Sequence, residues 1–253
     1  MDQEAEDRRY YLARAAELLA EFDQDAARWR PILAQQVGRE AAEAVLSAGR
    51  AEFQSLIPHI PYIGGEDSHA GSLVESVRCL ALYRAMQRQG RTAEETGKVL
   101  YDAVLARLGE PQPPPVHPLT AEQLMERRRR RAEWSQQRRY PAGYAYYFVA
   151  GDGQAFDYGY DFTECAALKF YRVQRAEEFL PFFCFLDHAY SQVYDLGLVR
   201  TTTLAEGGAR CDHRFRAGRQ TGAGWPPPFV AAGRPSVSES VSCLIQAAIL
   251  GEA

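Results

Sequence analysis

Three short motifs in the second half of the chain each join a thiol to an acid. They are Thr163-Glu164-Cys165, Cys184-Phe-Leu-Asp187-His188 and Gly207-Gly-Ala-Arg-Cys211-Asp212. A neighbouring carboxylate or a helix N-terminus decides whether a thiol is an inert packing group, a nucleophile or a metal ligand. Because the chain has no C-x-x-C pair, the fold must assemble any shared site from elements about twenty residues apart.

The spacing around the second motif predicts a polar stripe on a helix. In a helix of about 182–195, Cys184, Asp187, His188 and Ser191 stand at i, i+3, i+4 and i+7. The stripe faces either water or a pocket, and Cys is among the most buried residue types. For the first motif, a helix of about 164–173 with Thr163 as N-cap would bring Cys165 under a helix dipole that favours the thiolate.

The third motif lies in a predicted strand of about 210–216, where alternate residues share a face. Cys211 and His213 then face one side of the sheet, and Asp212 faces the other. We therefore expect Cys211 to converge on one pocket with Cys165, Cys184 and Asp187. Asp212 is expected to point away and to pair with arginines.

A zinc site is the main alternative for these residues, with the three motif cysteines and His188 or Asp187 as ligands. We favour a site without metal, because structural zinc usually takes at least one local thiol pair and this chain has none. The sequence has no phosphate loop, no G-x-S-x-G motif and no dinucleotide fingerprint, so no cofactor is predicted. Cys79 and Cys243 lie on apolar helical faces and are expected in the core.

The first half of the chain reads as helices. They are expected over about 12–28, ended by Trp29-Arg-Pro31, then over 40–54, 72–89, 92–108 and from Thr120, with non-helical chain over 57–65 and a proline-rich linker over 111–118. Capping boxes begin the helices at Thr92 and Thr120, the second of which carries the Arg127 to Arg131 run.

The pattern changes to strands after Pro141. A hairpin of 146–149 and 156–162 has one aromatic face, and further strands are expected over 199–204 and 210–216, with a last helix from Ser236. The predicted fold class is α+β, in which a helical portion packs on an antiparallel sheet with helices on one face. We place the helical portion at 1–138 and the α+β portion at 139–253, and expect the two to form one compact unit.

Composition restricts the partners. With 253 residues, 46% hydrophobic content and a net charge of −4, the chain is an ordinary globular protein that has no reason to bind nucleic acid or an anionic membrane. The arginine run is interleaved with glutamates, which favours a solvated helix face. Five cysteines, an acidic N-terminus and no apolar run of about twenty residues predict a cytoplasmic protein whose partner is a small molecule.

The three motifs, in this order and with Arg200-Thr-Thr-Thr203-Leu-Ala-Glu-Gly207 before the last, resemble the L-2-amino-thiazoline-4-carboxylic acid hydrolase family. In the first half, Ile60-Pro-Tyr-Ile-Gly64-Gly65 and Gly90-Arg-Thr-Ala-Glu-Glu95 resemble that family's helical portion. The resemblance extends over roughly residues 55–216, about the length of a single domain.

The resemblance implies a reaction that opens a cyclic isothiourea. Water or a thiol attacks the ring carbon between nitrogen and sulfur, and the tetrahedral intermediate collapses to a carbamoyl cysteine. Such chemistry needs a nucleophile or base, a proton donor and a cation for the substrate carboxylate. By resemblance, Cys184 is nucleophile or site thiol, Asp187 is base or orienting group, and Glu164 is a proton shuttle. The expected substrate-binding residues are Cys165, Cys211, His188, Gly64, Gly65 and Thr203.

The sequence has more aromatic residues near the predicted site than a pocket for a small amino-acid substrate would require. Phe182, Phe183 and Phe185 flank Cys184, and Tyr144, Tyr146 and Tyr147 lie near the hairpin, which together predict a more apolar pocket. Two alternatives therefore stay open. The protein is a tailoring enzyme of natural-product biosynthesis that opens or closes a ring in a larger substrate, or it is a non-catalytic module that binds a small molecule.

Overall fold

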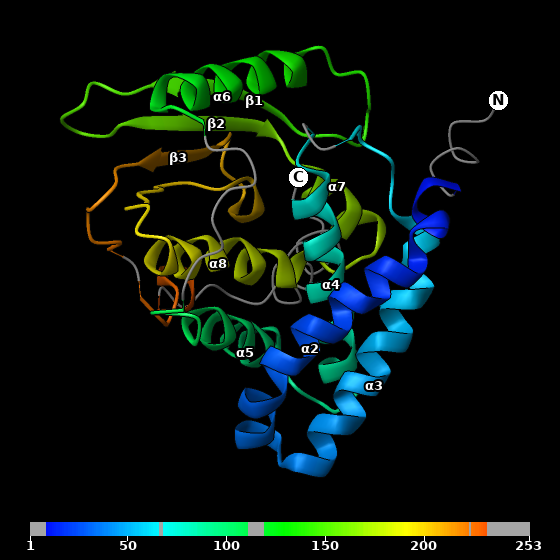
Figure 1. Cartoon of the computed structure of the whole chain (residues 1–253). Coiled ribbons are helices and arrows are strands. Elements are labelled where there is room, and N and C mark those ends of the chain that lie inside the picture. Colours follow the sequence, from blue (N-terminus) through cyan, green and yellow to red (C-terminus); the bar gives the residue numbers. More distant parts are fainter. Residues whose placement is uncertain (1–8, 66–67, 111–118, 223, 232–253) are drawn as a thin grey trace, which may run out of the picture. The chain divides into compact units, whose positions relative to one another are not determined.

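The computed structural model describes residues 9–65, 68–110, 119–222 and 224–231 (Figure 1). Residues up to Gly222 form one compact unit, and the chain from Ala223 onward, with the short helix α9 (Pro228–Ala231), forms a second. The predicted linker over 111–118, the last helix from Ser236 and the core position of Cys243 lie outside the described residues.

Helices α2 (Ala15–Val37) and α3 (Arg39–Leu56) pack against each other, with Gly38 at a φ of 86° between them. The expected break at Trp29-Arg-Pro31 is wrong, because α2 continues through Pro31. Its buried residues, Leu18, Phe22, Ala26, Trp29 and Leu33, keep helical spacing across the proline. Burial of Trp29 and Leu33 contributes about 1.5–3 kcal/mol each, which offsets the cost of about 3 kcal/mol for an interior proline.

Two further helices complete the first half. Helix α4 (Ala70–Gln87) packs on α3, and α5 (Ala93–Leu105) begins with the predicted capping box between Thr92 and Glu95. After α3 the chain forms a short 3-10 turn, η1 (Ile57–His59), and residues 60–65 are neither helix nor strand. The proline and glycine pattern of this segment therefore excluded an α-helix correctly.

The sheet is antiparallel and three-stranded, with the order β1 (Ala145–Ala150), β2 (Tyr158–Glu164), β3 (Cys211–Phe215). Its register pairs Tyr146 with Phe162 and Tyr160 with His213. The rings of Tyr146 and Phe162 stack with centroids 4.6 Å apart. The predicted hairpin with one aromatic face and the predicted α+β class are confirmed.

The expected strand over 199–204 is wrong. Only Val199 makes an isolated bridge, to Arg214, and the chain then turns into a 3-10 helix, η4 (Leu204–Glu206). The backbone amides of Thr201 and Thr202 donate to the carboxylate of Asp212 and not to a neighbouring strand. A side chain thus supplies the hydrogen bonds that a sheet ladder would have supplied.

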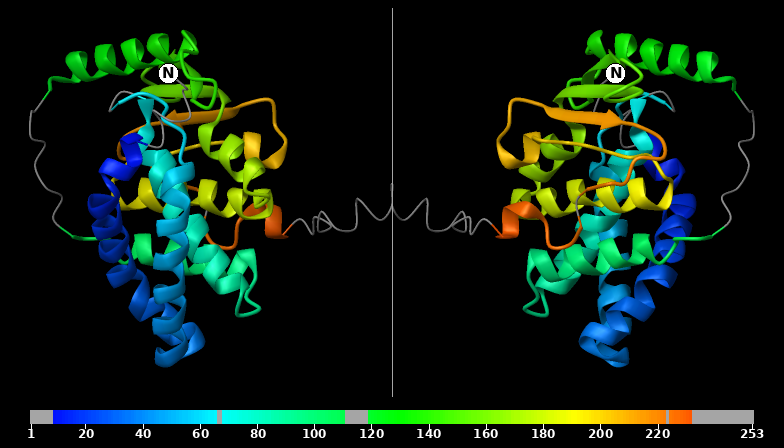
Figure 2. Two further views of the ribbon diagram at one scale, coloured as in Figure 1. Left: turned by 90° about the vertical axis from the view of Figure 1, so that its right-hand side faces the viewer. Right: turned by 90° about the vertical axis from the view of Figure 1, so that its left-hand side faces the viewer.

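Helix α8 (Leu180–Val193) lies between the sheet and α5 (Figures 1 and 2). Helix α7 (Ala166–Val173) precedes it in the chain. Helix α6 (Ala121–Gln136) begins with the predicted capping box at Thr120 and runs along the edge strand β1. Ser135 and Gln136 hydrogen-bond the backbone of Tyr146 at 2.9–3.1 Å, which satisfies the backbone groups of this edge-strand residue.

The arginine run of α6 is largely a solvated face, since Arg127, Arg129 and Arg130 are exposed. Arg128 and Arg131 are half-buried, and the Arg128 guanidinium stacks 3.8 Å from the ring centre of Tyr158. Among the described residues, no helix is both long and apolar enough to cross a membrane. The division of the chain at residue 138 stays a prediction.

Candidate functional site

A cavity of about 410 Å³ lies between the aromatic face of the sheet and helices α4, α7 and α8. The sheet contributes Tyr160, Phe162, Cys211, His213 and Phe215, which share one face because side chains alternate along a strand. The remaining lining residues are His69, Ser72, Glu75, Tyr144, Cys165, Ala167, Phe183, Cys184, Leu186, Asp187, Tyr190 and Arg200. The structure therefore brings Cys165, Cys184, Cys211 and Asp187 to one cavity.

The three thiols in the cavity are held in their protonated form. Burial raises the pKa of Cys165 to about 11 and raises the pKa of Cys184 and of Cys211 as well. The expected N-cap is wrong, because Cys165 itself caps α7 through a hydrogen bond of 3.4 Å from the Leu168 amide to its sulfur. That amide favours the thiolate, but burial outweighs it, so the expectation of a thiolate at Cys165 is also wrong.

Asp187 is an ionised carboxyl group of the cavity, and Arg200 is its cationic partner. Its Oδ2 accepts from Arg200 Nη1 at 2.6 Å and lies 3.3 Å from His213 Nε2. Burial would raise the pKa of this carboxyl, but His213 and Arg200 outweigh burial and hold the pKa below its usual value. The Asp187 side chain is 47% exposed although protein surrounds it, because its free surface faces the cavity.

The region of the chain that forms this cavity matches one family model. Residues 72–215 match the model of L-2-amino-thiazoline-4-carboxylic acid hydrolase. The chain belongs to this family. No curated protein and no solved structure matches the chain. Membership supports a hydrolase-like function, and of the cavity-lining residues only His69 lies outside the matched region.

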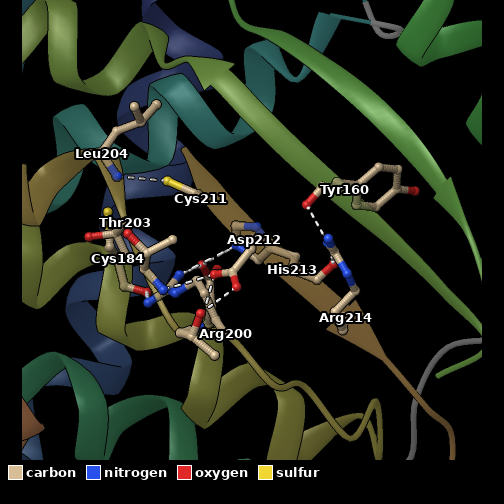
Figure 3. Close-up of polar contacts among 12 residues, drawn as sticks. Tyr160, Cys184, Arg200, Thr203, Leu204, Cys211, Asp212, His213 and Arg214 are labelled. Carbon is tan, nitrogen blue, oxygen red and sulfur yellow. Dashed lines mark hydrogen bonds and ion pairs between the residues drawn. The ribbon is translucent and has the colours of Figure 1, made fainter. Parts of the chain in front are cut away.

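Within this hydrolase-family region, Asp212 points away from the cavity, as expected, but its partners are not arginines. Its carboxylate accepts from the amides of Thr201 and Thr202 at 2.8 Å and from the Thr201 hydroxyl at 2.6 Å (Figure 3). The arginine pair belongs to Asp161, which is bridged by Arg214 and Arg210. Asp212 lies between these two arginines in sequence and opposite Asp161 in the β2–β3 register, and its carboxylate instead fixes the 201–202 segment.

The predicted polar stripe of α8 divides between two environments. Cys184 and Asp187 face the cavity, whereas Ser191 accepts from the Leu198 amide at 2.8 Å and contacts the Thr221 hydroxyl. His188 is buried against the ring of Phe185, and burial lowers its pKa to about 4. The stripe divides because α8 is covered on two sides, by the sheet and by α5.

The other predicted site residues do not line the cavity. Glu164 forms ion pairs with Lys169 at 2.5 Å and Arg138 at 2.7 Å, which is not the placement of a proton shuttle at this cavity. Thr203 caps the turn η4 by accepting from the Glu206 amide. Gly64 has a φ of 98°, and a Cβ there would lie 2.7 Å from the Trp134 ring. The carbonyls of Gly64 and Gly65 accept from the Ser68 hydroxyl.

Sequence reasoning missed Glu75, Tyr190 and Arg200 as members of the site. Arg200 is 5% exposed, and its Nη2 donates to the Cys184 carbonyl at 2.9 Å (Figure 3). Glu75 Oε1 accepts from the Tyr190 hydroxyl at 2.5 Å. A weak sequence indication existed, because His69, Ser72 and Glu75 follow each other at three-residue steps along the start of α4.

His69 lies at the N-terminus of α4 with a φ of 60°, which is unusual for a residue other than glycine. Its Nε2 lies 3.0 Å from the Tyr146 hydroxyl, and burial lowers its pKa to about 4, so the imidazole is neutral at pH 7. No cluster of three His, Cys, Asp or Glu side chains suited to a metal ion occurs among the described residues.

Proposed function

We propose that this protein is a hydrolase that opens a small heterocycle at a C–N or C–S bond, with Asp187 as general base. The observation that carries the proposal is the ionised, cavity-facing carboxylate of Asp187, fixed by Arg200 and His213 beside three protonated thiols. In this site the thiols line the cavity, and water is the nucleophile that fits the protonation states.

The reaction follows from these groups. Asp187 takes a proton from a water molecule while the oxygen of that water bonds to the ring carbon. This addition gives a tetrahedral intermediate. Oδ2 is occupied by Arg200 and His213, whereas Oδ1 accepts no hydrogen bond from any described residue and is free to hold the water. The intermediate then collapses, the bond from that carbon to the ring nitrogen or sulfur breaks, and the departing atom takes a proton.

The charges in the cavity fit a substrate with a cationic head. A protonated cyclic isothiourea or amidine carries positive charge next to the carbon under attack, and Asp187 complements it. Arg200 is the one Arg or Lys side chain among the lining residues described, so it is the candidate cation for a substrate carboxylate. The aromatic rings of Tyr160, Phe162 and Phe215 supply apolar surface for the remainder of the ligand.

The size of the cavity favours a substrate larger than L-2-amino-thiazoline-4-carboxylic acid, the compound after which the family is named. About 410 Å³ lies within the range that drug-sized ligands occupy, and most of the wall is apolar or aromatic. This supports a tailoring enzyme of natural-product biosynthesis as the second candidate, acting on a larger heterocycle with the same base.

The test is turnover of 2-amino-thiazoline-4-carboxylate and of congeners with larger ring substituents by wild type and by Asp187→Asn. We expect the variant to lose about 10²–10⁴-fold in kcat. Asp187→Asn also leaves Arg200 without its carboxylate partner. The control is therefore Asp187→Glu, which keeps the negative charge but displaces the carboxylate that acts as base. Undiminished turnover in both folded variants would exclude Asp187 as base, and ligand binding without turnover by wild type would establish the non-catalytic module.

A further inference from the structure

A second carboxyl group faces the cavity in an environment opposite to that of Asp187. Glu75 of α4 and Tyr190 of α8 both line the cavity, and the Tyr190 hydroxyl donates to Glu75 Oε1 at 2.5 Å. Oε2 accepts no hydrogen bond from any described residue. Tyr190 stands three residues after Asp187, so both side chains leave the same face of α8.

Among the described residues, no cation forms an ion pair with Glu75. The charge of Arg78, one turn further along α4, acts on Glu75, but Arg78 Nε donates to Asp25 at 2.7 Å and its Nη1 donates to Glu21 at 2.7 Å. Both of these acids come from α2. A buried carboxyl group without a counter-ion is cheaper to keep protonated than ionised.

The groups around Glu75 include some that raise its pKa and some that lower it. They are Tyr190 and Asp187 from α8, Arg78 and Cys79 from α4 and Asp25 from α2. Burial raises the pKa of Glu75, and the charges of Asp25 and Asp187 raise it further, while the Tyr190 hydrogen bond and Arg78 lower it. The raising effects dominate. Two carboxyl groups of one cavity thus have pKa values shifted apart, which is the pattern of an acid and a base.

We propose that Glu75, positioned by Tyr190, is the general acid that protonates the ring atom expelled when the heterocycle opens. The proposal rests on the hydrolase function proposed above. Glu75 gives its proton to the departing nitrogen or sulfur as the bond to the former ring carbon breaks, and the electron pair of that bond stays with the departing atom. The proton that Asp187 took from water restores Glu75 through solvent, so the cycle consumes one water.

The test compares Glu75→Gln and Tyr190→Phe with wild type in pH–rate profiles for 2-amino-thiazoline-4-carboxylate and its larger congeners. Glu75→Gln should lose about 10²–10⁴-fold in kcat and lose the fall in rate that wild type shows at rising pH, where Glu75 deprotonates. Tyr190→Phe removes a hydrogen bond that lowers the pKa of Glu75, so the fall should move to higher pH. A merely structural role would move neither limb.

A second readout does not depend on turnover. The infrared difference spectrum between wild type and Glu75→Gln, recorded as the pH is raised, should contain the carbonyl band of a protonated carboxyl group at pH values where an ordinary glutamate is already ionised. Absence of that band overturns the proposal. A Glu75→Gln variant that keeps the wild-type kcat and an unchanged basic limb of the pH–rate profile overturns it as well. If wild type turns over none of the probes, the hydrolase function fails and the acid role fails with it; an inactive Asp187→Asn beside an active Glu75→Gln removes the acid role alone.

Discussion

Arg200 Nη1 lies 2.6 Å from Asp187 Oδ2, and the same guanidinium donates through Nη2 to the backbone carbonyl of Cys184. A single buried cation thus fixes the carboxylate and the helix turn that carries it. The planar fork of arginine makes the two contacts from separate nitrogens in a fixed geometry, which the single nitrogen of a lysine ammonium does not reproduce.

Arg200→Lys should therefore keep the charge and lose the geometry. We expect kcat/KM to fall by about 10–100-fold, because misplacing a catalytic group by about 1 Å has effects of this size. The acid limb of the pH–rate profile should move to higher pH, since Asp187 loses part of the stabilisation that lowers its pKa. Wild-type kcat/KM in Arg200→Lys would show that this pair is not needed.

Asp212→Ala should mainly lower stability. The variant removes three hydrogen bonds to the 201–202 segment, a loss of about 1–3 kcal/mol in the free energy of unfolding. Urea denaturation measures this loss, and kcat should stay within about tenfold of wild type because Asp212 does not line the cavity. A stable Asp212→Ala without turnover would move the base from Asp187 to Asp212.

The cavity thiols should react slowly. A pKa of about 11 for Cys165, against an ordinary 9.0, lowers its thiolate fraction about 100-fold at neutral pH. Iodoacetamide labelling of the native protein, followed by mass spectrometry, should leave Cys165 and Cys184 unmodified while urea-unfolded protein reacts. Alkylation of Cys184 as fast as a free thiol would restore it as nucleophile.

The contact between α5 and α8 depends on Gly97. A Cβ at this position would lie 2.8 Å from the Cβ of Phe182, so Gly97→Ala should cost about 1–3 kcal/mol and shift α8. The matched control is Gly71→Ala, also in a helix, where a Cβ meets nothing within 4 Å. That control should gain about 0.5–1 kcal/mol. Equal thermal stability of the two variants would contradict the close approach.

Stability should fall as the pH drops below about 6.5. Burial lowers the pKa of His69 and of His188 to about 4, so the unfolded chain binds protons between about pH 6.5 and 4 that the folded chain does not. Each histidine then destabilises the fold by up to about 3 kcal/mol at pH 4. Asparagine tolerates the positive φ at position 69. His69→Asn should therefore reduce the slope of the free energy of unfolding against pH by the contribution of one histidine. Identical slopes in urea unfolding would show that His69 titrates normally.

Local patterns determined most of the secondary structure. The two capping boxes, the exclusion of α-helix over 57–65 and the aromatic hairpin all depend on residues close together in sequence, so they could be predicted. The motifs of the cysteines and Asp187 also identified the segments that form the cavity. The same local reasoning failed at Pro31, because the packing of Trp29 and Leu33 against other helices overrides the proline.

Only the tertiary structure decided which groups of the site are charged and which of them meet. Local reasoning favoured a thiolate at Cys165, but burial under the sheet reverses that preference. Glu75 and Tyr190 are separated by 115 residues and meet because α4 and α8 line the same cavity. Asp187 obtains its partners from the 199–203 segment and from β3. Protonation depends on desolvation and on neighbouring charges, and both are properties of the packed chain.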